Sequence, residues 1–192
     1  MKLIQMELQQ FQLFVQSAGV VVAAAALLAN AYFAYLRMRH DNASRSISAS
    51  ASLVRDWRDK ETQEALRFIY NDLRREYPDP RACGYTNIPD TKQRAMVFRV
   101  SHLCDEIGTR TICGEADAEF VVTILGDSIV RLAEILRPYL LAERVWRSSR
   151  GISGRGAAEY QSSFLALADK AARTNIEDLI TRRNASFLKR KI

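Results

Sequence analysis

The feature that most constrains this chain is a long run without charge near its N-terminus. No charged residue occurs between positions 8 and 36, and Arg37 and Arg39 follow at once. The apolar part, from Leu13 to Leu36, forms a helix long enough to cross a bilayer core of about 30 Å at a rise of about 1.5 Å per residue. We therefore predict one transmembrane helix within an N-terminal segment, residues 1–40.

Two other interpretations of this run stay open. A secretory signal peptide would carry its basic residues before the apolar run, where only Lys2 stands, although Ala29–Ala31 looks like a cleavage site. Tyr32–Leu36 continue the apolar stretch past that point, which a cleaved peptide does not need. A buried core helix is the second alternative, because Ala23–Ala26 are weakly hydrophobic and Gln16 interrupts the run.

The flanks of the run predict its orientation. Positive charge lies almost entirely after it, with Lys2 alone before it, and the basic residues that follow are Arg37, Arg39, Arg45, Arg55 and Arg58. Because basic loops stay on the cytoplasmic side, we expect the C-terminal part of the chain to be cytoplasmic. The cysteines agree with a reducing compartment, since three of them at irregular spacing do not suggest a disulfide framework.

Small residues within the run suggest that the anchor associates with copies of itself. They recur at helical spacing as Gly19, Ala23, Ala26 and Asn30. Such a seam lets two helices approach closely, and an asparagine can hydrogen-bond across the interface. The sequence therefore predicts the lipid bilayer as one partner and a homo-oligomer through the membrane helix as another.

The charge of the remaining chain argues against nucleic acid as a partner. The formal net charge is +6, and much of it lies just after the apolar run and in the C-terminal tail. This distribution favours attraction to an anionic membrane leaflet. No arginine cluster is interleaved with aromatic residues, as a single-strand binder would need.

Residues beyond the anchor divide into three segments. Residues 41–59 are rich in Ser and Ala without Gly or Pro, which favours a continuing helix over a linker but leaves both open. Residues 60–174 are expected to form a cytoplasmic helical bundle, and residues 175–192 a basic C-terminal tail. No stretch alternates apolar and polar residues as a half-buried strand would, so the predicted fold class is all-α.

Apolar periodicity predicts four main helices in the bundle. They cover residues 60–76, 91–107, 115–146 and 157–173, with Gly108 and Gly114 bracketing the connection between the second and the third. We expect these two to form an antiparallel pair at the centre of the bundle. Pro138 should kink the third helix or end its first half. The expected buried positions are Ala65, Phe68, Ile69, Leu73, Val97, Val100, Cys104, Ile107, Val122, Leu125, Ile129, Leu132, Leu136, Tyr139, Tyr160, Phe164, Leu167 and Ala171.

The order of these segments resembles a known family. The segments that carry the resemblance contain Trp57 with Glu64 and Ala65, Glu106 near the end of one helix, and Gly126-Asp127 with Leu132, Leu136, Pro138 and Tyr139 in the next. The chain is similar to the domain of unknown function 4760 family of bacterial membrane-anchored proteins. The resemblance implies a single-pass protein of the bacterial inner membrane with a cytoplasmic helical domain. It implies nothing about chemistry, because that family has no established activity.

The polar residues around position 104 do not add up to a metal site. His102 and Glu106 share a helix face, but Cys104 and Asp105 point elsewhere, and a zinc site usually needs a third or fourth ligand. We predict that Cys104 belongs to the core and that no metal or cofactor is bound.

A second set of polar residues has a structural interpretation. Glu106 with Arg110, and Asp127 with Arg131, could face each other between two helices as an acid–base pair. The alternative, which we favour, is that all four serve helix packing.

A glycine-rich segment supplies a weak ligand-binding candidate. Residues 151–156 precede a predicted helix and are surrounded by Arg147, Arg150 and Arg155. Phosphate-binding loops normally follow a strand, so a contact with a nucleotide or phospholipid headgroup is the less favoured interpretation and a plain interhelical loop the favoured one.

Two functional hypotheses follow, and neither is an enzyme, because no nucleophile and base can be paired from the sequence. The first is a membrane-tethered binding or scaffolding module for an unknown protein partner or ligand. The second is an oligomeric membrane effector of the stress or antiphage type, gated by a small nucleotide.

Overall fold

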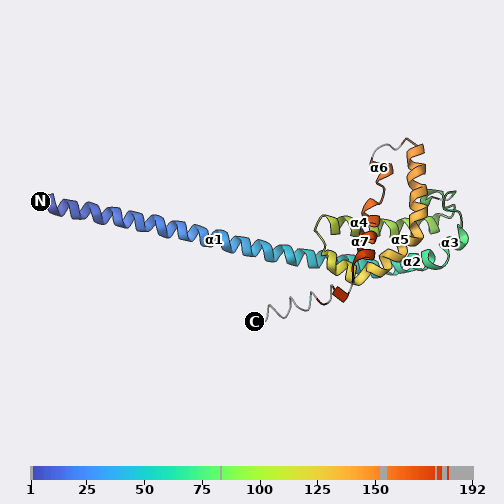
Figure 1. The fold of residues 1–192 in the computed structure, drawn as a ribbon, viewed down its shortest axis with the longest axis horizontal. Helices are drawn as coiled ribbons and strands as arrows, with labels where there is room; N and C mark the ends of the chain where they lie inside the picture. Colours follow the sequence, from blue (N-terminus) through green and yellow to red (C-terminus); the bar gives the residue numbers. More distant parts are fainter. Residues whose placement is uncertain (1, 83, 152–154, 176, 179–180, 182–192) are drawn as a thin grey trace. The chain divides into compact units, whose positions relative to one another are not determined.

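A computed structural model gives the backbone of every residue except 1, 83, 152–154, 176, 179–180 and 182–192, and its side chains are described outside these and residues 2–25, 39, 42–43 and 155. Within these limits all regular structure is helical, which confirms the all-α class. The elements, coloured along the chain in Figure 1, are α1 (Lys2–Arg58), α2 (Lys60–Asn71), α3 (Leu73–Glu76), the 3-10 helix η1 (Tyr85–Asn87), α4 (Thr91–Ile112), α5 (Ala118–Ser149), α6 (Arg155–Ala158) and α7 (Ser162–Arg173).

Residues 1–45 and 46–192 form two compact units. Across the described residues, the structure contains no helix with an apolar stretch long enough to cross a membrane. The predicted span covers residues 13–36, and the side chains of residues 13–25 lie outside the description.

The stretch from 41 to 58 is part of α1, which settles the choice between helix and linker there in favour of a helix. Its last turns belong to the folded second unit. Leu53, Val54 and Trp57 are buried in the hydrophobic core. The hydroxyl of Ser50 accepts a hydrogen bond from the backbone N–H of Asp117 at 2.9 Å, which ties α1 to the start of α5.

The first predicted bundle helix, residues 60–76, is divided in two. Asp59 caps α2 by accepting from the N–H of Glu61 at 3.2 Å, as short polar side chains do at helix starts. The helix is interrupted at Asp72, and α3 then ends just before the Tyr77–Pro78 step, as predicted from the proline. The four residues predicted to be buried here, Ala65, Phe68, Ile69 and Leu73, are all in the core.

The next helix is longer than predicted. α4 continues through Gly108 to Ile112, so the expectation that Gly108 ends the helix is wrong. Gly108 is buried, and a Cβ built on it would lie 2.3 Å from the backbone oxygen of Ser163 at the start of α7. The glycine therefore allows two helices to approach closely, and a close tertiary contact explains it better than a helix stop.

Helix α5 has the buried residues and the kink that were predicted for residues 115–146. The six apolar residues predicted to be buried there, at alternating spacings of three and four, are all buried: Val122, Leu125, Ile129, Leu132, Leu136 and Tyr139. The helix changes direction between its yellow and orange parts in Figure 1, and Pro138 lies inside it. Proline has no N–H to donate to the carbonyl four residues earlier. That carbonyl, of Glu134, instead accepts a hydrogen bond from Nη2 of Arg74 at 2.8 Å.

The last predicted helix, residues 157–173, is broken. The chain turns at residues 159–161, where Gln161 has a φ of 54°, and α7 begins only at Ser162. The break is held by tertiary contacts, because Arg144 donates two hydrogen bonds to the carbonyl of Tyr160 at 2.9 and 2.7 Å. Phe164 and the other buried positions predicted in α7 lie in the core, whereas Tyr160 is only half-buried.

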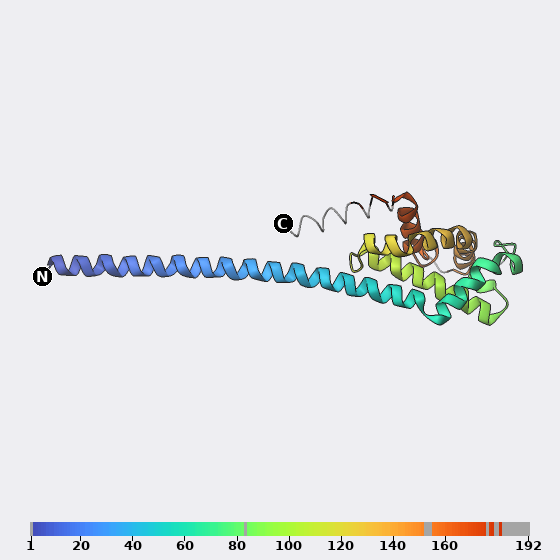
Figure 2. The same cartoon turned by 90° about the horizontal axis from the view of Figure 1, so that it is seen from below.

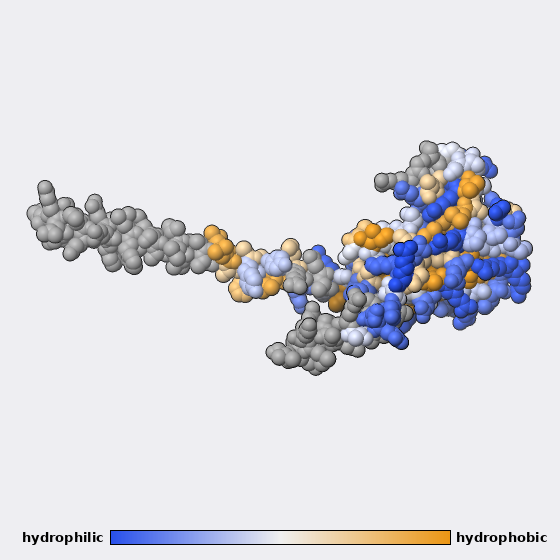
Figure 3. All heavy atoms as spheres, viewed as in Figure 1, coloured by the Kyte–Doolittle hydropathy of each residue, from blue (hydrophilic) through white to orange (hydrophobic). Residues whose placement is uncertain are grey.

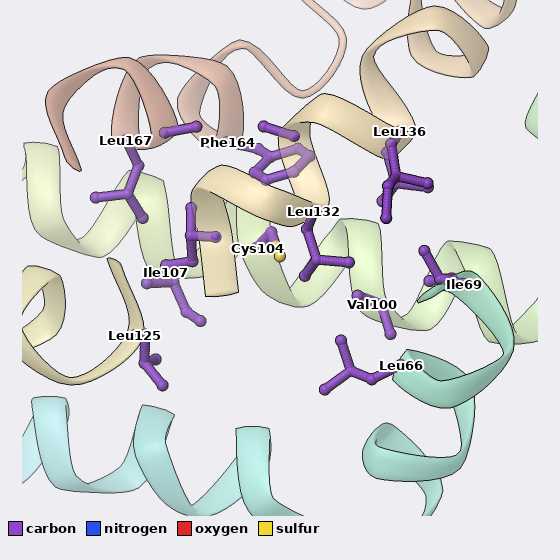
Figure 4. Packing of buried hydrophobic residues seen from close by; sticks show 14 of the residues in the cluster. Leu66, Ile69, Val100, Cys104, Ile107, Leu125, Leu132, Leu136, Phe164 and Leu167 are labelled. Atoms are coloured by element: carbon purple, nitrogen blue, oxygen red, sulfur yellow. The ribbon is translucent and has the colours of Figure 1, made fainter. Parts of the chain in front are cut away.

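We predicted that α4 and α5 would pack against each other at the centre of the bundle. In the structure α7 packs against both of them. Those two helices run in opposite directions, but each packs more extensively against α7 than against the other (Figures 1 and 2). Figure 4 shows Phe164 and Leu167 of α7 above Cys104 and Ile107 of α4, with Leu132 of α5 beside them. The core is therefore built around α4, α5 and α7, and α7 is separated from the other two by α6.

A cationic cleft as the candidate functional site

An open cleft of about 760 Å³ lies where α1 ends, α2 begins and α4 passes both. The chain bends at Asp59, between the end of α1 at Arg58 and the start of α2 at Lys60. The lining residues of the cleft are Arg55, Asp56, Arg58, Asp59, Lys60, Thr62, Arg99, His102, Leu103 and Glu106. All of them belong to the second unit.

One wall of the cleft is fixed by Arg99 of α4. Its guanidinium forms ion pairs with Asp59, at 3.3 Å, and with Glu61. Its Nε donates to the hydroxyl of Thr62 at 3.4 Å. Exposed pairs of this kind each contribute about 1 kcal/mol or less, but three contacts on one planar group hold α4 against the first turn of α2.

The cleft carries an excess of positive charge. Of its carboxylates, Asp59 is paired with Arg99, and Glu106 is paired with Arg110 at 2.6 Å. In the described part of the chain, no ion pair is found for three cations of the cleft, Arg55, Arg58 and Lys60. The same holds for the carboxylate of Asp56. Arg99 is shared by Asp59 and Glu61, so this group of three carries one net negative charge. Together with the three unpaired cations and the one unpaired carboxylate, this leaves an excess of one positive charge, which can attract an anion.

A network of polar side chains leads inward from the cleft at His102. The Nε2 of His102 lies 3.4 Å from the hydroxyl of Tyr160, and the imidazole stacks on Phe98 with ring centroids 5.7 Å apart. The amide Nε2 of the buried Gln161 donates to the hydroxyls of Tyr160, at 3.2 Å, and Ser101, at 2.9 Å. Burial raises the pKa of Tyr160 to about 12, despite the opposing charge of Arg147, so its hydroxyl keeps its proton at neutral pH.

Of the three arginines predicted to bind a ligand, Arg147 is engaged in the interior of the domain. Arg147 donates from Nε to the buried carboxylate of Glu143 at 2.9 Å, and its guanidinium lies 3.7 Å from the ring centre of Tyr160. Arg150 lies over the ring of Trp146 at 5.4 Å. The side chain of Arg155 lies outside the described residues. The binding site predicted from these three arginines therefore stays a prediction.

Glu143 is the charged residue most deeply enclosed by this arrangement. Its side chain is fully buried on α5 and accepts from the backbone N–H of Thr86 at 2.9 Å and from the hydroxyl of Thr86 at 2.7 Å. With the bond from Arg147, three donors converge on one carboxylate. A buried carboxylate needs such partners, because an isolated charge in the interior is very costly.

The two acidic residues that could have formed an acid–base pair lie in different cavities. Glu106 lines the cationic cleft, while Asp127 lines a separate cavity of about 520 Å³ between α5 and α7. Arg131 of that second cavity lies over the ring of Tyr70, 4.9 Å from its centre. Among the residues whose positions are described, no group of three or more His, Cys, Asp or Glu side chains could hold a metal ion.

Comparison with known proteins gives no relative for this chain: no family model, no curated protein and no solved structure matches it. The resemblance in segment order therefore stays a prediction.

The sequence did not lead us to predict the cleft, because Arg55 and Arg58 were interpreted only as charges flanking a membrane span. Arg55 and Arg58 are three residues apart, a spacing that places them on one face of a helix. Asp59 follows them and is a residue type that often caps the start of a helix. Together these features could have indicated a cationic cleft between two helices.

We expect the two described cysteines to differ strongly in reactivity. Cys104 is fully buried in the core, as predicted, and burial raises the pKa of its thiol far above the usual range, whereas Cys113 is exposed. Because the thiolate is the reactive form, iodoacetamide should alkylate Cys113 at least about tenfold faster than Cys104 in the folded protein, and equally fast in urea. The two residues lie on separate tryptic peptides, so mass spectrometry measures both rates in one sample. Similar rates without denaturant would contradict this packing.

Proposed function

We propose that this chain is a single-pass protein of the bacterial inner membrane, with a cytoplasmic helical domain that acts as a non-enzymatic binding module. The observation that carries the proposal is the cleft between α1, α2 and α4, whose cations Arg55, Arg58 and Lys60 are left without ion-pair partners in the described structure. On this view the cleft takes an anionic ligand or partner, and the N-terminal helix holds the domain at the membrane.

Exposed apolar side chains support the anchor. Between residues 27 and 38 of α1, seven large hydrophobic residues are exposed, among them Leu27 at 70%, Leu28 at 73% and Phe33 at 66% (Figure 3). A contiguous apolar surface of this kind is costly in water and favourable in lipid or against another helix. Ala26 and Asn30, the described members of the predicted seam, are also exposed, which leaves them available to a second copy.

The cleft also favours the second hypothesis, an oligomeric membrane effector gated by a small nucleotide. A nucleotide carries phosphate, and the unpaired arginines of the cleft are side chains suited to it. The two hypotheses share the anchor and the cleft and differ in what ligand binding does, so they are distinguished by whether a bound ligand changes membrane permeability.

The anchor is tested by fractionation and by topology reporters. The full chain should remain in the membrane pellet after extraction with alkaline carbonate. A C-terminal green fluorescent protein fusion should fluoresce, and a C-terminal alkaline phosphatase fusion should be inactive. The double variant Leu27→Arg/Leu28→Arg should become extractable, because each arginine near the centre of a span costs about 2.5–3.5 kcal/mol. The matched control, Ile47→Arg/Ile112→Arg, places the same charge on exposed apolar residues outside the run and should stay in the pellet.

Binding in the cleft is tested on the detergent-solubilised full chain by calorimetry with ATP, inorganic pyrophosphate and hexaglutamate. At least one of these anions should bind the wild type, and charge reversal in Arg55→Glu/Arg58→Glu should abolish binding. The control Arg67→Glu/Arg81→Glu changes charge equally, outside the cleft, and should bind as the wild type does. Absence of binding by all three anions, or equal binding by the cleft variant, would overturn the proposal.

A further inference from the structure

We infer that the basic C-terminal tail, residues 182–192, docks in a groove between α5 and α7 of the same chain. This goes beyond the proposed function, because it involves neither the cationic cleft nor the membrane anchor. The inference draws on the residues of the groove, on the point where the tail leaves the described structure, and on the composition of the tail.

The groove consists of two adjoining cavities, which share Val122 of α5 and Thr174 at the end of α7. Their volumes are about 520 Å³ and about 380 Å³. In the larger cavity the lining residues Val122, Gly126 and Ala171 are buried and Val130 is half-buried, so they form an apolar floor. Because Gly126 and Ala171 are small, the space above them is open to side chains from another segment.

Two carboxylates lie at the rim of this floor. Asp127 and Glu134 are exposed and stand seven residues apart, which places them two turns apart on one face of α5. In the described part of the chain neither takes part in an ion pair. The neighbouring cations are engaged elsewhere, since Arg131 lies over the ring of Tyr70 and Arg74 donates to the backbone carbonyl of Glu134. Both carboxylates are therefore available to a basic segment.

The tail starts beside the groove. Thr174, Asn175 and Asp178 line its smaller cavity, and Thr181 is the last residue that the structure describes. Residues 182–192 reach about 36–40 Å when extended, whereas α5 covers only about 18 Å between Val122 and Glu134. A segment joined this closely to its site has an effective concentration there of about millimolar, so weak contacts are enough to dock it.

The composition of the tail matches the groove. Residues 182–192 contain no acidic residue, and Phe187 and Leu188 stand between two groups of basic residues, which are Arg182, Arg183, Lys189, Arg190 and Lys191. The apolar pair suits the apolar floor, and the basic groups suit the two carboxylates at the rim. The cationic cleft, by contrast, would repel this segment.

A photo-cross-link tests where the tail lies. The full chain, with p-benzoylphenylalanine in place of Phe187, is illuminated in a neutral detergent, digested with trypsin and analysed by mass spectrometry. The cross-link should join the tail to residues 111–131, which include the α5 side of the groove, or to residues 171–173 of α7. Cross-links only to other peptides, or only between two copies of the chain, would overturn the inference.

Trypsin cleavage after Arg182 and Arg183 tests which contacts hold the tail. A synthetic peptide of residues 176–192 gives the rate for an undocked tail, and the wild type should be cut at least about tenfold more slowly, because cleavage follows the undocked population. Asp127→Asn/Glu134→Gln should speed cleavage at least about threefold by removing the carboxylates, and Phe187→Ser/Leu188→Ser should do the same by removing the apolar contacts.

A matched control and a change of surroundings complete the test. Glu64→Gln/Glu115→Gln removes the same charge from exposed positions that line neither cavity and should be cut as the wild type is. If Asp127→Asn/Glu134→Gln were also cut at the wild-type rate, the groove would not hold the tail. Protection that appears only after phosphatidylglycerol bicelles are added would overturn the inference in favour of the membrane surface. None of these outcomes depends on anion binding in the cleft.

Discussion

Replacing Gly108 by alanine is expected to destabilise the helical domain by about 3 kcal/mol or more, although alanine is the better helix former. The added Cβ would lie 2.3 Å from the oxygen and 2.5 Å from the carbonyl carbon of Ser163. Both are backbone atoms, so no side-chain rotation relieves the clash, and α7 must move away from α4. That movement would also strain the hydrogen bond from the N–H of Phe164 to the carboxylate of Asp105, at 3.0 Å, which holds the first turn of α7.

A second glycine provides a matched control. Gly126 lies inside α5, and a Cβ there would meet Val122 Cγ1 at 3.4 Å and Ala171 Cβ at 3.6 Å, which are ordinary contacts. Gly126→Ala should therefore be neutral or stabilising, by up to about 1 kcal/mol, through helix propensity alone. Urea unfolding of the detergent-solubilised chain, followed by tryptophan fluorescence, measures both variants. A Gly108→Ala variant as stable as Gly126→Ala would refute the close approach of α4 and α7.

Removing the carboxylate of Glu143 should have the other large effect, a loss of about 3–5 kcal/mol in Glu143→Ala. Three donors point at this buried group, two from Thr86 and one from Arg147. Without it, their hydrogen bonds are lost and the charge of Arg147 has no partner. Glu143→Gln should cost less, about 1–3 kcal/mol, because the amide keeps one acceptor oxygen but turns an NH₂ group toward groups that also donate.

Local opening of one segment provides a specific readout of the role of Glu143. Thr86 belongs to the segment between α3 and α4 and is held to α5 through Glu143, so its release should expose that segment first. Limited trypsin digestion should therefore cut faster after Arg81 in Glu143→Gln than in the wild type, before the domain unfolds globally. The exposed Glu64→Gln serves as control and should change stability by less than about 0.5 kcal/mol. Unchanged cleavage at Arg81 would show that Glu143 does not anchor the segment.

The comparison of α4 with the α6–α7 region shows which structural features local sequence patterns can predict and which they cannot. In α4 the spacing of Val97, Val100, Cys104 and Ile107 predicted the buried face correctly, since periodicity reports which side of a helix is apolar. In the α6–α7 region the same reasoning predicted one helix where the structure has a turn at Gln161. The turn depends on Arg144, which donates to the carbonyl of Tyr160 from a helix 16 residues earlier, and no local pattern records that bond.

The candidate site was harder to predict than the fold, for a related reason. The charges of Arg55 and Arg58 are visible in the sequence, but whether a cation is free depends on which carboxylates fold next to it. Arg99 takes Asp59 from a position 40 residues earlier, and Glu143 takes Arg147, which had been a candidate ligand-binding residue. Pairing across the fold thus decided which cations remain for a ligand.

The sequence by itself determined the all-α class, the buried faces of the helices, the kink at Pro138 and the buried state of Cys104, because each depends on spacing or residue type within a few turns. Only the tertiary structure decided the role of Gly108, the burial of Glu143 and the excess positive charge of the cleft. These depend on contacts between residues that are distant in the chain, such as Thr86 and Glu143, 57 positions apart. Such contacts follow from how all the helices pack together, and no periodic pattern in the sequence indicates that packing.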